Sequence, residues 1–170
     1  MSETLAAALP GELDEQAERL MKRLCEGDLT IATAESCTGG MLAALLTDIQ
    51  GAGHAFERGF VTYTKEAKTE LLGIQPAILD HNDAVSETVA RAMAEGALAR
   101  SHADLAFGVT GFAGPAADGC EEGLVHMALA RRGGETIHRV AHFGAAGRGP
   151  VRVKTLEAML DMLEDALPPR

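Results

Sequence analysis

The stretch TIATAESCTGG, residues 30–40, constrains the fold of this chain more than any other part of it. A run of small and β-branched residues leads into Glu35 and Ser36, two glycines follow, and an apolar pattern with helical spacing begins at Met41. This order predicts a strand, a tight turn and the start of a helix. The exposed backbone N–H groups at such a turn suit an anion or a developing oxyanion. Ser36 then stands where a nucleophile is presented, or it serves with Thr38 only as a helix cap.

Strand-like and helix-like patterns alternate along the remaining chain. The expected helices cover residues 13–24, 39–48, 65–72, a segment that begins at Ser86, and 156–167; the expected strands cover 29–35, 60–64, 104–109, 123–131 and 135–143. The alternation predicts a single α/β domain, a three-layer α/β/α sandwich with a mixed sheet. We expect residues 1–11 to form a flexible N-terminal arm and residues 12–170 to form the domain. In such a fold, ligands bind where the strands end.

Charge and composition exclude several classes of protein. The net charge of −10 argues against a nucleic-acid-binding protein, which needs a cationic face. No apolar run approaches the roughly 20 residues of a membrane span, and the acidic N-terminus lacks the basic region of a signal peptide. The cysteines Cys25, Cys37 and Cys120 show no CxxC spacing, which indicates a reducing compartment. We therefore predict a cytoplasmic protein without nucleic-acid or membrane partners.

One residue at the end of the second expected strand and one in the helix after it could activate Ser36. Tyr63 is the only tyrosine of the chain, and Lys68 lies in the first turns of the next expected helix. A lysine enclosed near a serine has a lowered pKa and can act as its base, because a serine hydroxyl is inert until a neighbour takes its proton. Ser36, Tyr63 and Lys68 would then form a catalytic unit. Alternatively, Lys68 is a solvated surface charge and Tyr63 a packed aromatic.

A glycine-rich stretch, GVTGFAGP at 108–115, follows a buried strand. It has neither the spacing of a Rossmann fingerprint nor the Gly-Lys-Ser/Thr of a Walker A loop. Gly111 and Gly114 would still let the backbone approach a ligand closely, and Thr110 could contribute a hydroxyl. The alternative is a structural turn closed by Pro115.

Arg148 and Arg152 precede the last amphipathic pattern and open the last expected helix. Arginine binds phosphate in a bidentate manner, so either residue could hold a nucleotide phosphate. A surface role is the alternative for both.

Two competing chemistries remain open. His138 and His142 lie on one face of a predicted strand with His126 on its neighbour, but no HExxH or carboxylate cluster accompanies them, so we predict no metal site. Cys37 is the rival nucleophile, because a helix N-terminus favours a thiolate. Its alternative role is that of a small buried hydrophobic residue.

Four segments together carry a family resemblance. AESCTGG at 34–40, FERGFVTYTKEAK at 56–68, AVSE at 84–87 and GVTGFAGP at 108–115 resemble, in this order, the C-terminal domain of the competence/damage-inducible protein CinA. The resemblance runs from about residue 12 to residue 167. Stand-alone members of that family are nicotinamide mononucleotide (NMN) amidohydrolases.

The resemblance implies hydrolysis of the NMN carboxamide to nicotinic acid mononucleotide and ammonia, without a metal or organic cofactor. It also implies a nucleotide as the small-molecule substrate and a homo-oligomer, a dimer or a trimer. A nucleotide-binding module without activity, or an amidase for another small amide, is the alternative. The implied catalytic residues are Ser36, Tyr63 and Lys68, and the implied substrate-binding residues are Cys37, Thr38, Gly39, Gly40, Thr110, Gly111 and either Arg148 or Arg152.

Overall fold

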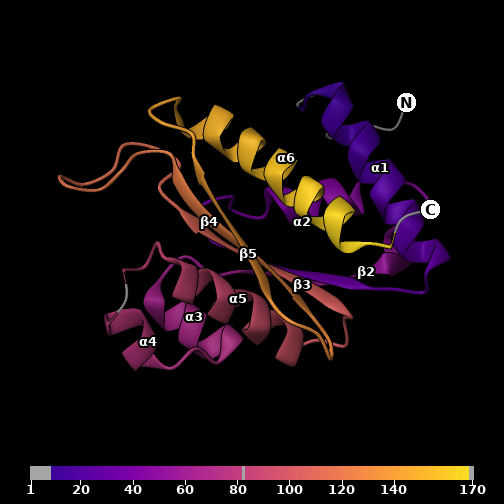
Figure 1. The fold of residues 1–170 in the computed structure, drawn as a ribbon, viewed down its shortest axis with the longest axis horizontal. Helices are drawn as coiled ribbons and strands as arrows, with labels where there is room; N and C mark the ends of the chain where they lie inside the picture. Colours follow the sequence, from indigo (N-terminus) through magenta and orange to yellow (C-terminus); the bar gives the residue numbers. More distant parts are fainter. Residues whose placement is uncertain (1–8, 82, 169–170) are drawn as a thin grey trace.

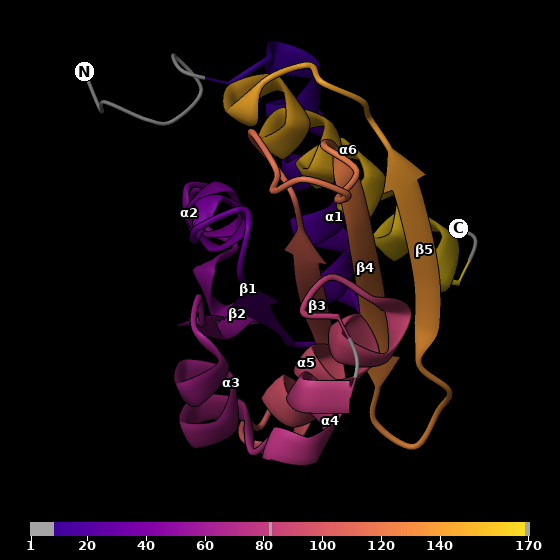
Figure 2. The same cartoon turned by 90° about the vertical axis from the view of Figure 1, so that its left-hand side faces the viewer.

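A five-stranded mixed sheet forms the centre of this computed structural model, which describes residues 9–81 and 83–168. Its strand order is β2-β1-β3-β4-β5, with β2, β1 and β3 parallel and β4 and β5 added as an antiparallel hairpin. The strands are β1 (Ile31–Glu35), β2 (Phe56–Val61), β3 (Leu105–Gly111), β4 (Leu124–Arg131) and β5 (Ile137–His142). Figure 2 shows β2 and β5 at the two edges of the sheet.

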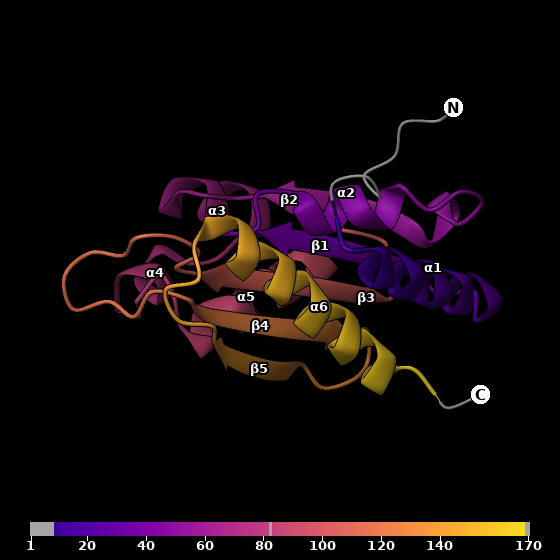
Figure 3. The same cartoon turned by 90° about the horizontal axis from the view of Figure 1, so that it is seen from above.

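Helices cover both faces of the sheet (Figures 1 and 3). One face carries α1 (Gly11–Glu26), α2 (Met41–Thr47) and α6 (Arg148–Ala166). The other face carries α3 (Lys65–Leu72), α4 (Pro76–His81) and α5 (Glu87–Ala99). A short 3-10 helix, η2 (Gly53–Ala55), precedes β2. The prediction of a three-layer α/β/α domain is therefore confirmed.

The central strand β1 shows why the sheet needs both layers. All five of its residues are buried, with Ile31 in the core under α1, α2 and α6 and with Ala32 and Ala34 in the core under α5. Such a strand reads as an apolar run because helices cover both of its faces. On the α5 side, Gly108 of β3 must lack a side chain, because a Cβ there would lie 2.4 Å from the Ala90 carbonyl oxygen. The helix therefore packs directly on the sheet backbone.

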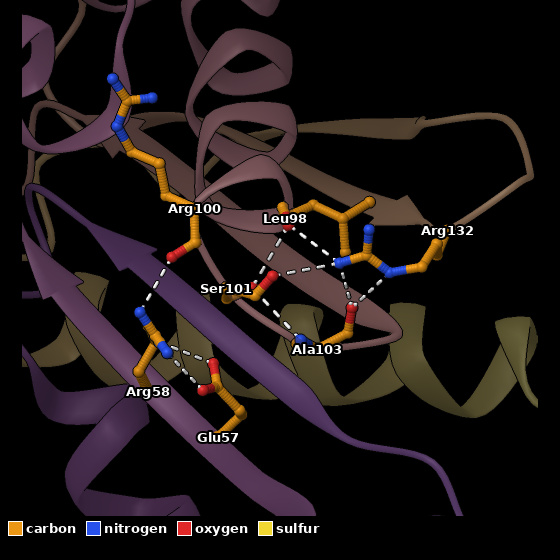
Figure 4. Close-up of polar contacts among 7 residues, drawn as sticks. All are labelled: Glu57, Arg58, Leu98, Arg100, Ser101, Ala103 and Arg132. Carbon is orange, nitrogen blue, oxygen red and sulfur yellow. Dashed lines mark hydrogen bonds and ion pairs between the residues drawn. The ribbon is translucent and has the colours of Figure 1, made fainter.

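Polar contacts stabilise the end of the sheet at which β1, β2 and β3 begin (Figure 4). The Arg132 guanidinium donates hydrogen bonds of 2.8–3.2 Å to the carbonyl groups of Leu98, Ser101 and Ala103, which end α5 and lead into β3. Arg58 pairs with Glu57 and donates to the carbonyl of Arg100 at 2.9 Å. These contacts satisfy the carbonyl groups that a helix end leaves without partners.

Several predicted boundaries need correction. The second strand spans Phe56–Val61 rather than 60–64, so Tyr63 follows the strand instead of ending it. The FVTYT run has strong β propensity, but the register is set by Gly59, where a Cβ would come within 3.1 Å of Thr33. The strand predicted at 104–109 extends to Gly111. The short helix α4 lies in the segment between α3 and α5, for which the sequence analysis gives no element.

Other boundaries agree with the sequence. Gly73 ends α3 in a left-handed conformation, and the Ser86 side chain caps α5 by accepting from the Val89 N–H. The predicted arm falls mostly on residues 1–8, which lie outside the described residues, whereas Gly11 already belongs to α1. Within the described residues, no helix has the length and apolar character that crossing a bilayer requires.

Candidate active site

Ser36 lies directly after β1, in the turn that joins this strand to α2. Its backbone N–H donates to the Val109 carbonyl at 3.2 Å, which ties it to the neighbouring strand β3. Its side chain points to the α3 side of the sheet, where Lys68 Nζ lies 3.1 Å from Ser36 Oγ. The hydroxyl and the amine, 32 positions apart in the chain, are therefore within proton-transfer reach.

Lys68 is buried in α3 and 3% exposed. Besides Ser36, its amine contacts the carbonyl oxygens of Thr62 at 2.9 Å and Tyr63 at 3.0 Å. Burial lowers the pKa of the Lys68 amine from its ordinary value. A neutral amine has two protons and one lone pair. The two carbonyl groups can accept the two protons, and the lone pair is then left for the hydroxyl of Ser36.

The Tyr63 side chain lies apart from this pair. It is 71% exposed, and among the described residues its hydroxyl makes no hydrogen bond to Ser36 or Lys68. The contact to Lys68 comes from the main-chain carbonyl of Tyr63. Tyr63 is one of the residues that line a cavity beside the turn. The structure thus brings Ser36 and Lys68 together and leaves the tyrosine hydroxyl outside the pair.

Glu35, the last residue of β1, was not among the predicted site residues. Its carboxylate is 0% exposed and accepts hydrogen bonds from the N–H groups of Gly40 at 3.1 Å, Leu42 at 3.0 Å and Ala43 at 2.8 Å. The available signal was an acidic residue at the end of an apolar strand, because a buried charge needs partners. The sequence could not show which partners these are.

The glycines of the turn have a different role from the one expected. The Gly39 N–H donates to the Ser36 carbonyl, and the Gly40 N–H donates to Glu35, so neither is free for an anion. Both residues have positive φ angles, 62° and 94°, which glycine adopts without strain. The N–H groups of Cys37 and Thr38 make no backbone hydrogen bond within the described residues. In the turn, these two N–H groups are therefore the ones left without a backbone acceptor among the described residues.

Cys37 is buried in the core on the opposite side of the turn from Lys68. Burial raises the pKa of the Cys37 thiol to about 12. A thiol with such a pKa is almost entirely protonated at neutral pH and is a poor nucleophile. The geometry therefore favours Ser36 over Cys37 as the nucleophile.

The two arginines of α6 have different surroundings. Arg152 Nε donates to the Cys37 carbonyl at 2.8 Å, so this side chain braces the turn. Arg148 lines the cavity, and its guanidinium comes within 2.8 Å of the position that a Cβ on Gly114 would occupy. The absence of a side chain at Gly114 makes room for Arg148. Only Arg148 faces the cavity.

Thr110 and Gly111 lie at the end of β3 rather than in a loop. The Thr110 hydroxyl is buried and donates to the Ala84 carbonyl at 2.7 Å, so its proton is used within the fold. Gly111 borders the cavity, but a Cβ there would lie 2.8 Å from the Val125 side chain. Packing against β4 therefore requires this glycine.

The cavity beside the turn has a volume of about 90 Å³ and is lined by Cys37, Tyr63, residues 111–115 and Arg148. A larger cavity of about 280 Å³ lies between α3 and α4 and is lined mostly by exposed residues. Ser36 and Lys68 line neither cavity, but the small one reaches Cys37, the residue next to Ser36. Pockets for organic ligands usually measure several hundred Å³. A ligand bound beside Ser36 must therefore extend beyond the small cavity into solvent.

The histidines noted in the sequence form a pair, not a metal cluster. His126 Nδ1 lies 3.0 Å from His138 Nε2, and Glu87 is the neighbour of His138 at 3.5 Å. His142 pairs with Glu121 instead. The part of the chain that the structure describes contains no group of three or more His, Cys, Asp or Glu side chains arranged to hold a metal ion.

Comparison with known proteins places this chain in a family. The family model of the CinA C-terminal domain matches residues 13–167. The chain belongs to this family. A CinA-like protein of Syntrophus aciditrophicus is 49% identical over 144 residues, which is 83% of this chain and 34% of that protein. A CinA-like protein of Geobacter sulfurreducens is 42% identical over 97% of this chain and 40% of its own length. The CinA domain thus spans about a third of the length of these curated relatives.

Solved structures of CinA proteins share the whole fold. The competence/damage-inducible protein CihA from Agrobacterium tumefaciens is 41% identical, with a TM-score of 0.89 over 97% of this chain and 98% of that chain. A CinA superfamily protein from Escherichia coli is 35% identical, with a TM-score of 0.85 over 91% of this chain and 90% of that chain. The resemblance expected from the four sequence segments is confirmed.

Proposed function

We propose that this CinA domain is a metal-independent amidohydrolase that converts NMN to nicotinic acid mononucleotide and ammonia. Ser36 is the nucleophile and Lys68 is its general base. The choice of NMN rests on the family resemblance, and the chemistry rests on the geometry of the site.

One observation carries the proposal: a buried lysine amine lies between a serine hydroxyl and two main-chain carbonyl groups. Burial disfavours the charged ammonium form. The carbonyl groups of Thr62 and Tyr63 orient the amine so that its lone pair faces Ser36 Oγ. A surface lysine would have neither the burial nor the orientation.

In the reaction, Lys68 accepts the Ser36 proton while Oγ attacks the carboxamide carbon. The N–H groups of Cys37 and Thr38 stabilise the oxyanion, a contribution that is usually among the largest in acyl transfer. The Lys68 ammonium gives this proton to the leaving nitrogen. Ammonia departs, and the acyl group remains on Ser36 as an ester. Lys68 then takes a proton from a water molecule that attacks the ester, and its ammonium gives this proton to Ser36 Oγ as the acyl–oxygen bond breaks and the acid product leaves.

Arg148 binds the phosphate of the substrate, because it is the arginine that faces the cavity. The carboxamide lies at Ser36, the ribose passes Tyr63, and the phosphate reaches Arg148 in the wall of the small cavity. The tyrosine ring then acts as a wall of the binding site, and its exposed hydroxyl has no part in the proton transfer.

The size of the cavity favours one alternative, an amidase for a smaller amide. A volume of about 90 Å³ holds a carboxamide with a small substituent more readily than a nucleotide. The same site would carry out the same chemistry without using Arg148.

An ammonia-release assay on NMN, nicotinamide riboside and nicotinamide tests both readings. We expect turnover of NMN, loss of at least about 10⁴-fold in kcat with Ser36→Ala, and activity within about threefold of wild type with Cys37→Ala. Preference for nicotinamide would favour the smaller amide. Thermal stabilisation by NMN without ammonia release would show a binding module. Loss of activity in Cys37→Ala but not in Ser36→Ala would identify Cys37 as the nucleophile.

The proposal includes a cytoplasmic location and a homo-oligomeric state. All three cysteines are free thiols, which suits a reducing compartment. Val61 and Tyr63, both exposed, lie at the end of the edge strand β2, and contact with a second copy would cover them. Sedimentation analysis of the purified protein measures the oligomeric state directly.

A further inference from the structure

We infer that Glu35 is a positioning residue that holds the nucleophile turn in its reactive shape. This inference rests on the proposed function, in which Ser36 is the nucleophile. Glu35 touches neither Ser36 Oγ nor Lys68 through its side chain, and it acts through the backbone of residues 36–43.

Glu35 joins three elements that must stay in register around Ser36. Its main-chain carbonyl accepts from the Thr62 N–H at 2.8 Å, at the end of β2. In the sheet, Glu35 is paired with Val109 of the parallel strand β3. Its side-chain carboxylate binds the first turn of α2 through Gly40, Leu42 and Ala43. The same residue therefore fixes the strand before Ser36 and the helix after it.

The carboxylate replaces a missing helix cap. Gly40 stands at the N-cap of α2 in a left-handed conformation and has no side chain with which to cap the helix. The N–H groups at a helix start need acceptors, and a negative charge there is favoured by the helix dipole. Glu35 supplies both from the strand side, so α2 cannot move without disturbing β1. The intervening turn is held at both of its ends.

This arrangement bears on catalysis because the reactive groups lie inside the held segment. The Cys37 and Thr38 N–H groups and the Ser36 hydroxyl all lie between Glu35 and Gly40. A displacement of about 1 Å in a catalytic group can cost about 100-fold in rate. Arg152 braces the same segment through the Cys37 carbonyl, but by a single hydrogen bond from a half-buried side chain. Three hydrogen bonds to a fully buried carboxylate make Glu35 the stronger of the two constraints.

The decisive variant is Glu35→Gln, which keeps the shape of the side chain. The glutamine amide has only one acceptor oxygen. Its NH₂ group would therefore face at least one backbone N–H that donates to the carboxylate in the wild-type protein. The matched control is Asp104→Asn. Asp104 also has a carboxylate that accepts hydrogen bonds next to β1, from the backbone N–H and the hydroxyl of Thr30 at 2.9 Å each, but at the end of the sheet where the parallel strands begin.

Each variant of the full chain is characterised in three ways. These are kcat and KM for ammonia release, the midpoint of thermal unfolding, and the rate at which iodoacetamide alkylates Cys37. Mass spectrometry of peptides separates Cys37 from the exposed Cys120, which serves as the internal standard. Cys37 is buried under the turn, so its alkylation reports opening of this segment. The charge of Glu35 also raises the pKa of the Cys37 thiol, and its loss adds to the increase in rate.

We expect Glu35→Gln to lower kcat by about 100-fold with KM changed by less than about threefold, since the binding groups stay in place. Alkylation of Cys37 should rise at least about tenfold relative to Cys120. Asp104→Asn should lower the unfolding midpoint to a similar degree and change neither kcat nor Cys37 protection.

The inference is overturned if Glu35→Gln unfolds earlier but keeps wild-type kcat and Cys37 protection, because Glu35 is then only a helix cap. If Glu35→Gln does not fold, Glu35→Asp keeps the charge on a shorter side chain and gives the same readouts. Absence of ammonia release from every amide in the wild-type protein contradicts the proposed function alone. Cys37 protection still decides the role of Glu35 in that case.

Discussion

The two ends of the central strands use polar groups in opposite ways. Where β1 and β3 begin, the polar groups are paired at a partly exposed surface, as Arg132 is with three carbonyl groups (Figure 4). Where these strands end, the polar groups are buried, and not all of them are satisfied. The hydroxyls of Thr38 and Thr62 have no hydrogen-bond partner within the described residues, and Lys68 is enclosed without a carboxylate at its amine.

This difference separates stability from reactivity. A charged group that is paired near solvent closes a helix end at little cost. A buried amine held by carbonyl groups favours its neutral form, and the neutral form is the one that can take a proton. The beginning of the strands therefore stabilises the fold, and the end of the strands holds groups that can react. The following experiments test this difference, first with variants at the end of the strands and last with a variant at their beginning.

Lys68→Met carries the largest expected effect. It removes the base and should lower kcat by roughly 10²- to 10⁴-fold. The control is Lys65→Met on the same helix, where the exposed amine pairs with Asp80, and kcat should stay within about twofold. Ammonia release under saturating substrate measures both. Equal loss in the two variants would contradict a special role for the buried lysine.

The pH dependence of kcat/KM tests the same residue in the wild-type protein. Burial lowers the pKa of Lys68, so the neutral base is present above this lowered pKa and is lost as the pH falls through it. Activity should therefore rise with pH along a limb that lies below the ordinary lysine pKa of about 10.4. A limb at the ordinary value would show that the amine is not desolvated.

Arg148→Met should have an intermediate effect. A charge-assisted hydrogen bond contributes about 1.5–3 kcal/mol, which corresponds to roughly a 10- to 100-fold rise in KM for NMN. Turnover of nicotinamide riboside, which lacks the phosphate, should stay unchanged. Arg152→Met provides the comparison, since this side chain holds the Cys37 carbonyl and should lower kcat for both substrates. The same rise in KM for both substrates would show that Arg148 does not bind the phosphate.

Arg132→Met has the smallest expected effect on activity and acts at the other end of the strands. It removes the Arg132 donor from the carbonyl groups of Ser101 and Ala103, at a cost of about 1–3 kcal/mol of unfolding free energy. Urea denaturation measures this cost, with the exposed neighbour Arg131→Met as the control. The kcat of the folded variant should equal that of the wild type. A fall in kcat would mean that the two ends are coupled.

Much of the fold was predictable because its signals are local. The turn after β1, the end of α3 at Gly73 and the cap of α5 at Ser86 each depend on residues within a few positions of one another. The position of β2 was not predictable in this way. Its register depends on Gly59 packing against Thr33 of another strand, and the β propensity of the residues after it indicated a later strand.

The candidate site shows the same division. The pattern of the sequence identified Ser36 and Lys68 as partners. It grouped Tyr63 with this pair, whereas in the structure only the main-chain carbonyl of Tyr63 contacts Lys68 among the described residues, and it left Arg148 and Arg152 equivalent. Glu35 was missed because its partners lie on a helix that follows a turn. Side-chain direction depends on the packing of whole elements, which no local pattern contains.

The sequence alone determined which chemical groups are available and which local structures carry them: a serine at a strand end, a lysine one helix later, and glycines that permit the turn between strand and helix. Only the tertiary structure decided what those groups can do. Packing α3 against the sheet buries one amine of several, brings it to 3.1 Å from one hydroxyl and surrounds it with carbonyl groups. Reactivity follows from this packing, because the proton affinity of a side chain depends on its solvation and its neighbours and not on its residue type alone.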